Sequence, residues 1–203
     1  MKQKLKTALV SVSDKTDLSI VLKTLNKYKV EIISSGGTYK SIKQLGYHCT
    51  EISTYTGFKE MLDGRIKTLH PKVHAGILHD RSNKKHTQEM NKHKFPSLDL
   101  IIVNFYPFQK IVMNSKSDKE IIENIDIGGP TMVRAAAKNF KNVIIITNKS
   151  DYPDLIKEVE KNKGNTTLSF REYMSSKAFG LTAYYDAMIA NWFNQKLKIK
   201  FPE

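Results

Sequence analysis

The sequence predicts a three-layer α/β fold, in which a mostly parallel sheet carries helices on both faces. Short apolar segments rich in valine and isoleucine recur along the chain, and segments with helical spacing separate them. This alternation is typical of parallel sheets, whose crossover connections are helices. The 203 residues are 40% hydrophobic and 26% charged, which is enough apolar material for a substantial core. Because no repeat or flexible linker divides the chain, we expect a single domain over residues 1–203.

The apolar segments predict five strands, at residues 6–13, 30–35, 48–52, 98–104 and 142–148. Helical spacing predicts helices at residues 18–28, 39–46, 84–92, 119–124, 130–139, 152–161 and 169–194. The last helix is apolar enough to pack on the sheet or on a partner subunit, and packing on the sheet is the favoured interpretation. Residues 53–81 lack clear periodicity and are interpreted as a long loop, which in folded proteins is functional or disordered.

The composition argues against a sequence-specific nucleic-acid-binding protein, although the formal net charge is +13. Only four of the basic residues are arginines, the side chain that base-reading sites favour, and the 29 lysines are spread along the whole chain. A positive field of this kind also attracts small phosphorylated metabolites. We therefore expect a small-molecule substrate and no specific nucleic-acid partner.

No apolar segment approaches the roughly 18 residues that a membrane-spanning helix needs. The first residues also lack the apolar core and the small-residue cleavage site of a signal peptide. The single cysteine, Cys49, has no partner for an internal disulfide, and it is interpreted as a half-buried strand residue rather than a catalytic thiol. These features favour a soluble, cytoplasmic protein without a membrane partner.

Two turns rich in hydroxyl groups follow the first two predicted strands, "SVSDK" and "SSGGT". In the first turn Asp14 is either a helix cap, with Lys15 in solvent, or part of an anion site. In the second turn the glycines allow the backbone to approach a ligand closely. Neither turn is a Walker loop or a GxGxxG fingerprint, so a triphosphate or a dinucleotide is not implied. Because adjacent strand ends meet in a parallel sheet, the two turns together predict one phosphomonoester pocket.

The long loop contains "GRIKTLHPKVHAGIL", in which Arg65 and Lys67 are candidates for closing over an anionic substrate. Its histidines, His70, His74 and His79, lack the HExxH arrangement and a credible further ligand for a metal. Structural hydrogen bonding is the favoured interpretation of the three histidines, and we expect no metal site.

Two more segments carry candidate side chains. Asn104 and Tyr106 lie at the end of the fourth strand, where Tyr106 is either a core aromatic or, together with Asn104, a hydrogen-bond donor for a polar ring. In "DIGGPTMVRAAAKN", Asp126 precedes a glycine pair and Lys138 lies about two turns into the following helix. Local pattern alone makes Lys138 a surface lysine.

These motifs together resemble the N-terminal domain of the bifunctional purine-biosynthesis enzymes that combine formyltransferase and IMP cyclohydrolase activities. The segments "SVSDK", "SSGGT", "TGFKEMLDGRIKTLHPKVHAGIL", "NFYPF", "DIGGPTMVRAAAKN" and "SSKAFGLTAYYDAMIANWF" occur in the same order and cover essentially the whole chain. The resemblance implies a fold like that of methylglyoxal synthase. It also implies an IMP cyclohydrolase that closes the ring of FAICAR, the formylated aminoimidazole carboxamide ribonucleotide, to give IMP and water without a cofactor.

The resemblance further implies a homodimer. The formyltransferase half of the family is absent from these 203 residues, so formyl transfer is expected only of a longer parent protein.

The resemblance implies substrate-binding residues at three strand ends, in the 65–68 segment and before the 130–139 helix. They are Ser13, Asp14, Lys15, Ser35, Gly36, Gly37, Thr38, Arg65, Ile66, Lys67, Thr68, Val103, Asn104, Asp126 and Ile127. Lys138 matches the proton donor or acceptor of the family. The supporting catalytic groups implied are Lys67, Tyr106, Asp126 and Ser11. One departure is Phe140, because a histidine usually follows the Lys-Asn pair in the family.

Three alternatives remain open from the sequence. A methylglyoxal-synthase-like lyase acting on a triose phosphate would need a catalytic aspartate and histidine. A nucleotide sensor of the same fold would keep the "SGGT" turn but has no need of Tyr106, Asp126 and Lys138 together. A nucleic-acid-binding module would depend on charge alone.

Overall fold

A computed structural model describes residues 2–115 and 117–200, and a five-stranded sheet lies at its centre. The strands stand in the order β4-β3-β2-β5-β6. Their bounds are β2 (Thr7–Val12), β3 (Glu31–Ser34), β4 (Thr50–Glu51), β5 (Leu100–Asn104) and β6 (Ile144–Ile146). Every pair of neighbours in this sheet is parallel. The predicted parallel sheet is therefore confirmed, with β2 and β5 side by side at its centre.

The central strands are apolar almost throughout because both of their faces are covered. β5 and β6 pair in register from Leu100 opposite Ile144 to Ile102 opposite Ile146, and all of these side chains are buried. Such strands cannot face water, so helices must cover the sheet on both sides.

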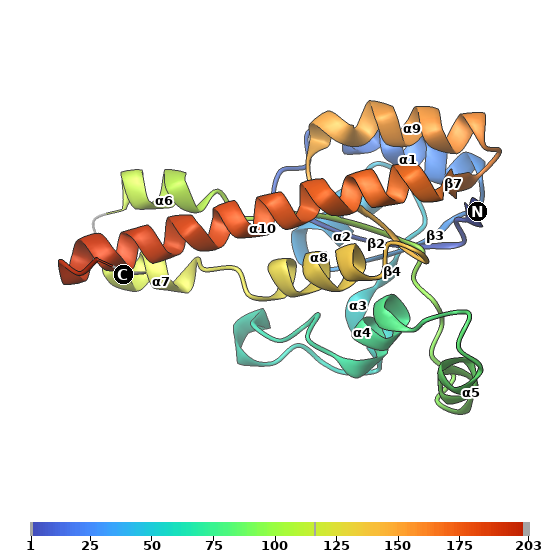
Figure 1. Cartoon of the computed structure of the whole chain (residues 1–203), viewed down its shortest axis with the longest axis horizontal. Helices are drawn as coiled ribbons and strands as arrows, with labels where there is room; N and C mark the ends of the chain where they lie inside the picture. The colour runs from blue at the N-terminus through green and yellow to red at the C-terminus, as the bar shows by residue number, and fades with distance from the viewer. Residues whose placement is uncertain (1, 116, 201–203) are drawn as a thin grey trace.

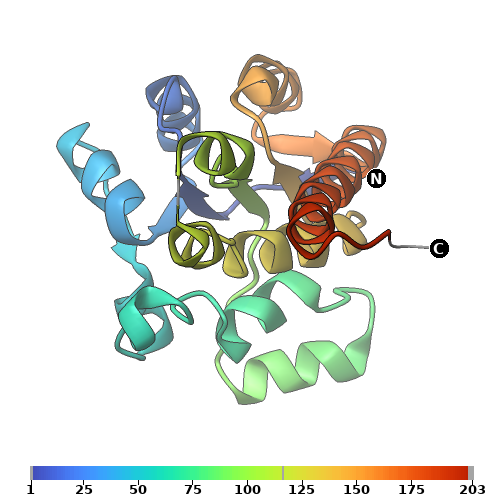
Figure 2. The same cartoon turned by 90° about the vertical axis from the view of Figure 1, so that its left-hand side faces the viewer.

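Residues 2–115 and 117–200 contain ten α-helices. They are α1 (Leu18–Lys27), α2 (Gly36–Gln44), α3 (Ile52–Thr56), α4 (Pro71–Leu78), α5 (Lys84–Lys92), α6 (Phe108–Asn114), α7 (Asp118–Glu123), α8 (Gly128–Lys138), α9 (Tyr152–Lys161) and α10 (Leu168–Leu197). Two 3₁₀ turns join them, η1 (Leu62–Gly64) and η2 (Lys149–Asp151). Helices α1 and α9 cover one face of the sheet, and α4 and α8 cover the other (Figure 2). The three predicted layers are confirmed.

The long helix α10 has two parts with different surroundings. Met174 and Ala178 in its first half belong to the main hydrophobic clusters, which confirms the predicted packing against the sheet for this half. The C-terminal half extends past the carboxyl ends of the strands and runs beside α6 and α7 (Figure 1). We call α6, α7 and this half of α10 the distal arm. A smaller cluster built on Phe108, Ile121, Tyr185 and Trp192 holds the arm together.

A second, two-stranded sheet was not predicted. β1 (Lys2–Lys4) pairs antiparallel with β7 (Asn165–Thr167), just before α10 begins. Nearby, Arg171 is fully buried and donates from Nε to the Phe140 carbonyl at 2.8 Å, from one terminal nitrogen to the Thr166 carbonyl and from the other to the Lys141 carbonyl. This guanidinium therefore joins α10 to β7 and to the turn before β6.

The prediction of a long loop over residues 53–81 was wrong, because this segment forms α3, η1 and α4. These helices are short, so their apolar residues repeat too few times to show a period. α4 begins at Pro71, and the ring nitrogen Nδ1 of His70 caps it by accepting the backbone N–H of Lys72 at 3.1 Å. The glycine pair expected as a separate turn is instead the first turn of α2. Cys49 is buried before β4, and burial raises the pKa of its thiol to about 11, which fits an unreactive side chain.

Candidate functional site

The turn after β2 is fixed by one side chain from the neighbouring strand, Asn104 at the end of β5. Its Oδ1 accepts hydrogen bonds from Ser13 N at 2.6 Å, from Ser13 Oγ at 2.9 Å and from Asp14 N at 3.2 Å. Its Nδ2 donates to the Asp14 carbonyl at 2.9 Å. The amide of Asn104 is thus engaged with the protein, and its role in this structure is to hold the turn. Val103, beside it, is buried and faces the core.

The turn after β3 becomes the N-terminus of α2. Gly36 has φ 53°, a left-handed conformation that strains any residue with a side chain. Thr38 Oγ1 donates to the Val12 carbonyl at 2.9 Å and accepts the Val12 N–H at 3.0 Å, which ties α2 to β2. Ser35 is buried and its side chain makes no capping hydrogen bond. Backbone N–H groups at the glycine start of α2 are therefore left for a ligand or water.

Two lysine ammonium groups lie over this glycine start. A Cβ atom built on Gly36 would stand 3.2 Å from Lys67 Nζ, and one built on Gly37 would stand 3.7 Å from Lys15 Nζ. Lys15 also donates to the Ser13 carbonyl at 3.1 Å, and Lys67 pairs with Glu60 at 3.2 Å. Two cations at the N-terminus of a helix form an environment that favours a phosphate.

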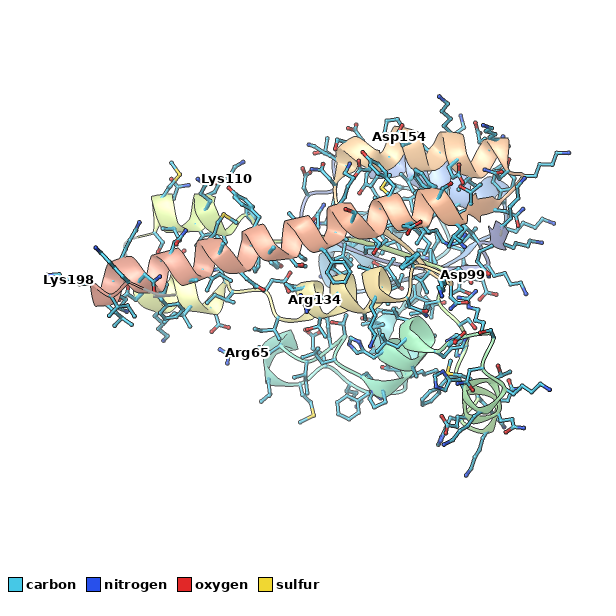
Figure 3. All side chains as sticks on the ribbon, in the orientation of Figure 1. Arg65, Asp99, Lys110, Arg134, Asp154 and Lys198 are labelled. Atoms are coloured by element: carbon cyan, nitrogen blue, oxygen red, sulfur yellow. The ribbon has the colours of Figure 1, made fainter. Side chains whose placement is uncertain are left out.

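The 65–68 segment lies between this anion site and α8. Thr68 is buried, and its Oγ1 stands 2.7 Å from the point that a Cβ on Gly128 would occupy. His74 on α4 hydrogen-bonds the backbone of Thr68, while burial lowers the pKa of the imidazole. The segment is thus anchored at Thr68. Arg65, at its other end, points outward (Figure 3) and pairs with Glu123 on α7. Ile66, between them, is half-buried.

Asp126 precedes α8 and is held at two points. Its backbone N–H donates to the hydroxyl of Tyr185 at 2.8 Å, and its Oδ1 accepts the N–H of Gly129 at 2.8 Å. A side chain at Gly129 would collide with this carboxylate, so the second glycine makes room for Asp126. Burial raises the pKa of the Asp126 carboxyl, while the hydrogen bond from Gly129 opposes that shift. Ile127, the next residue, is exposed.

Lys138 is not brought to this cluster within one chain. It lies in the last turn of α8, which is 11 residues long, so it stands about 15 Å from Gly128 along the helix. The next residue, Asn139, donates to the carbonyls of Ile77 and His79. That region lies at the amino edge of the sheet, because Leu98 N, just before β5, donates to the Gly76 carbonyl. Lys138 is therefore at the edge opposite to the anion site.

The other predicted catalytic groups lie at the carboxyl edge. Tyr106 follows β5 and its side chain is 53% exposed. Ser11 lies in β2 opposite Val103 and is half-buried, on the face of the sheet that α4 and α8 cover. The carboxyl edge thus collects Lys67, Tyr106 and Ser11, together with Asp126.

Sequence reasoning missed two side chains at this edge. Lys149 follows β6 and its Nζ lies 3.0 Å from Asp14 Oδ2. Hydrogen bonds from Thr16, together with Lys149, hold the pKa of the Asp14 carboxyl well below its usual range. The rule of strand ends, applied to "TNKSDY" after the fifth strand, would have found Lys149. The second side chain, Tyr185, lies in the last predicted helix, which was interpreted only as an apolar helix that packs on the sheet or on a partner.

Histidines predicted to serve in structural hydrogen bonds do so. His79 lies 3.1 Å from the Ala75 carbonyl through Nδ1 and 3.1 Å from Ser97 Oγ through Nε2. Across residues 2–115 and 117–200, no group of three or more histidine, cysteine or acidic side chains is arranged to hold a metal ion. The helices in these same ranges include none that is long and apolar enough to cross a membrane.

Comparison with known protein families shows which family this chain belongs to. Residues 17–131 match the family model described as the MGS-like domain. The chain belongs to the MGS-like domain family. Residues 136–203 match a second model, described as the AICARFT/IMPCHase bienzyme. The α/β fold and the predicted resemblance to the bifunctional purine-biosynthesis enzymes are thereby confirmed.

Relatives of this MGS-like domain include longer proteins named bifunctional purine biosynthesis protein PurH. The chain is 48% identical over 196 residues to the PurH of Bradyrhizobium diazoefficiens, covering 97% of this chain and 37% of that protein. It is 46% identical over 199 residues to the PurH of a Thermoanaerobacter species, covering 98% and 39%. The chain thus spans less than two fifths of these relatives. A solved structure described as the crystal structure of ForH has a TM-score of 0.82 and 31% identity, covering 93% of this chain and 99% of that one.

Proposed function

We propose that this MGS-like domain is an IMP cyclohydrolase, which closes the purine ring of FAICAR and releases IMP and water. The observation that carries the proposal is the pair of ammonium groups, from Lys15 and Lys67, over the glycine start of α2. This arrangement suits one phosphate on a small nucleotide. The PurH relatives and the match to the bienzyme model support the choice of purine nucleotide.

The nucleotide phosphate binds at Gly36 and Gly37 in this proposal, between the two lysines. The turn held by Asn104 provides Ser13 and Asp14 beside it. The remaining proposed contacts lie along the carboxyl edge, from Ser35 and Thr38 to the 65–68 segment and Ile127, and Val103 contributes through its backbone because its side chain faces the core. The side chains of Thr38 and Asn104 already bind the protein, so these two residues act by shaping the backbone around the substrate.

The reaction forms one carbon–nitrogen bond and removes one water. The carboxamide nitrogen attacks the formyl carbon and loses one proton, the formamido nitrogen loses the other, and the formyl oxygen takes up two protons and leaves as water. Asp126 is the proposed proton acceptor, because burial raises the pKa of its carboxyl toward that of a useful base. Tyr106 and Ser11 supply hydrogen-bond donors to the developing oxyanion, and Lys67 adds the field of its positive charge from the phosphate site. The step is not a redox reaction, and we propose that it needs no cofactor.

The proposed role of Lys138 in proton transfer rests on the family resemblance alone. Within one chain it lies at the opposite edge of the sheet, so this role requires a second copy of the chain. We therefore propose a homodimer in which Lys138 of one subunit serves the carboxyl edge of the other. Exposed large side chains along α10 offer apolar surface for such contacts; they are Tyr173, Phe179, Tyr184, Phe193 and Leu197.

The test is to incubate the purified chain with FAICAR and follow the formation of IMP. We expect turnover, and we expect Lys67→Ala to lower kcat/KM by about a hundredfold, because the variant loses one of the two cations of the anion site together with the charge that acts on the developing oxyanion. Lys157→Ala, which removes an exposed lysine from α9, is the matched control and should leave the rate unchanged. Binding of IMP without turnover of FAICAR would contradict the proposal and favour a nucleotide sensor. Turnover of a triose phosphate would favour a lyase instead.

A further inference from the structure

Tyr185 connects the distal arm to the candidate site through its hydroxyl group. The oxygen accepts the backbone N–H of Asp126 at 2.8 Å, across 59 residues of sequence. Tyr185 is 2% exposed, so water does not compete for this hydrogen bond. The contact joins α10 to the short link between α7 and α8, which contains Asp126.

The ring of Tyr185 reaches the second side of the site. Its centroid lies 4.9 Å from that of Phe105 and 6.1 Å from that of Phe108. Phe105 directly follows β5, and its carbonyl accepts the hydroxyl of Ser13 at 2.9 Å. Tyr185 therefore contacts the segment that leaves β5, at Phe105 and Phe108, and also the segment that returns to the site, at Asp126.

Asp126 has few other restraints. The link that contains it lies between two helices, so no helical or sheet ladder fixes its backbone. The carboxylate of Asp126 accepts the N–H of Gly129, and the backbone N–H of Asp126 donates to the hydroxyl of Tyr185. Without the hydroxyl of Tyr185, the backbone at Asp126 would be held from its carboxylate side only. The carboxylate would then sample orientations other than the one in this structure.

We propose that Tyr185 is a positioning residue, which fixes the carboxylate of Asp126 relative to the end of β5. The proposal rests on the function proposed above, in which Asp126 accepts a proton. A purely structural role would be ordinary for a buried tyrosine, because such residues usually place their hydroxyl on a hydrogen-bond partner. The two roles differ in what happens to kcat when the hydroxyl alone is removed.

The variant Tyr185→Phe removes the hydroxyl and keeps the ring against Phe105. Tyr184→Phe, at a neighbouring tyrosine that is 57% exposed, removes the same atom from the same helix and is the matched control. We expect Tyr185→Phe to lower kcat about tenfold with KM within about twofold of the wild type, since the anion site is untouched. We expect Tyr184→Phe to match the wild type in both constants.

A second measurement separates this proposal from the proposed function. Hydrogen exchange of the Asp126 amide, followed by NMR with IMP present, should be faster in Tyr185→Phe than in Tyr184→Phe. If the wild type forms no IMP, the proposed function fails, while the exchange experiment still tests the link between Tyr185 and Asp126. An unchanged kcat in Tyr185→Phe, or a loss of activity that only follows a loss of folded protein in urea titration, would overturn the positioning role.

Discussion

Lys67 Nζ lies 3.2 Å from the point that a Cβ atom on Gly36 would occupy. The ammonium therefore lies in tight contact with the position where any other residue would carry its Cβ atom. The backbone of Gly36 also has a positive φ of 53°. Its neighbour Gly37 differs in both respects: the nearest atoms to a Cβ there are Lys15 Cε and Nζ at 3.7 Å, an ordinary contact. Adjacent glycines in one turn thus meet different constraints.

This difference predicts unequal effects of Gly36→Ala and Gly37→Ala. Gly36→Ala should lower the free energy of unfolding by about 1–2 kcal/mol, from the left-handed conformation alone, and should also weaken binding of IMP by displacing Lys67. Gly37→Ala should change the free energy of unfolding by less than about 1 kcal/mol. Urea titration and calorimetric titration with IMP check both. Equal effects from the two substitutions would mean that the turn is not built as described.

The separation of Lys138 from Lys67 predicts complementation between subunits. Lys67→Ala and Lys138→Ala should each lose most of their activity as homodimers, about a hundredfold for Lys67→Ala. A heterodimer of the two, purified with two different tags, contains one carboxyl edge with Lys67 intact and Lys138 supplied by the partner subunit. It should recover roughly half of the wild-type activity, because a symmetric dimer has two equivalent sites. An inactive heterodimer, or full activity in Lys138→Ala, would refute the supply of Lys138 from the second subunit.

Two histidines predict that acid weakens the fold. Burial lowers the pKa of His74 and of His79 below their usual 6.5, and the charge of Arg81 adds to the shift at His79. The unfolded chain therefore takes up protons at a higher pH than the folded chain does. This contribution to stability is complete above pH 6.5 and is lost as the pH falls through the folded pKa values.

The urea concentration at the unfolding midpoint should therefore be lower at about pH 5.5 than at about pH 7.5. Replacing both His74 and His79 by glutamine should flatten this dependence. His48→Gln, at an exposed histidine, serves as the control. A double variant with the same pH dependence as the wild type would show that these imidazoles are not the cause.

The buried guanidinium of Arg171 predicts a large loss on a conservative change. Arg171→Lys should lower the free energy of unfolding by about 2–4 kcal/mol, since an ammonium cannot reach the Phe140, Lys141 and Thr166 carbonyls together. Arg134→Lys is the control, because Arg134 is exposed and its guanidinium carbon lies 5.9 Å from the Phe179 ring centroid. Its effect should stay within about 0.5 kcal/mol. Equal urea midpoints for both variants would disprove the structural role of Arg171.

The main sheet was predictable because its strands are apolar on both faces. "LIIVN" and "III" in β5 and β6 have few other uses in a folded domain, and strand ends then locate the site. β1 and β7 were not predictable, since "KQK" and "NTT" are polar and their pairing depends on segments far apart in sequence. Short helices such as α3 left no period to detect.

The candidate site was predictable as a set of segments but not as a set of contacts. The resemblance assigned Asp126 and Lys138 to one site. A helix that connects two parallel strands runs antiparallel to them, so α8 starts beside Asp126 at the carboxyl edge of the sheet and ends with Lys138 at the amino edge. The hydrogen bond between Tyr185 and Asp126 depends on where α10 passes the start of α8, which no local pattern encodes. Phe140, where the family usually has histidine, also contributes to the fold through its backbone. Its carbonyl accepts a hydrogen bond from Arg171, and this contact does not depend on the side chain at position 140.

The pairing of β1 with β7 has a consequence for the order in which the chain folds during synthesis. Residues 2–4 leave the ribosome well before their pairing partners, which are residues 165–167. β1 must therefore wait unpaired until all the residues of the main sheet have been synthesised. Contacts between such distant residues slow folding, because a long loop must close before the contact forms. The pairing of β1 with β7 therefore forms only after the residues of β2 to β6, which lie between them in sequence, have been synthesised.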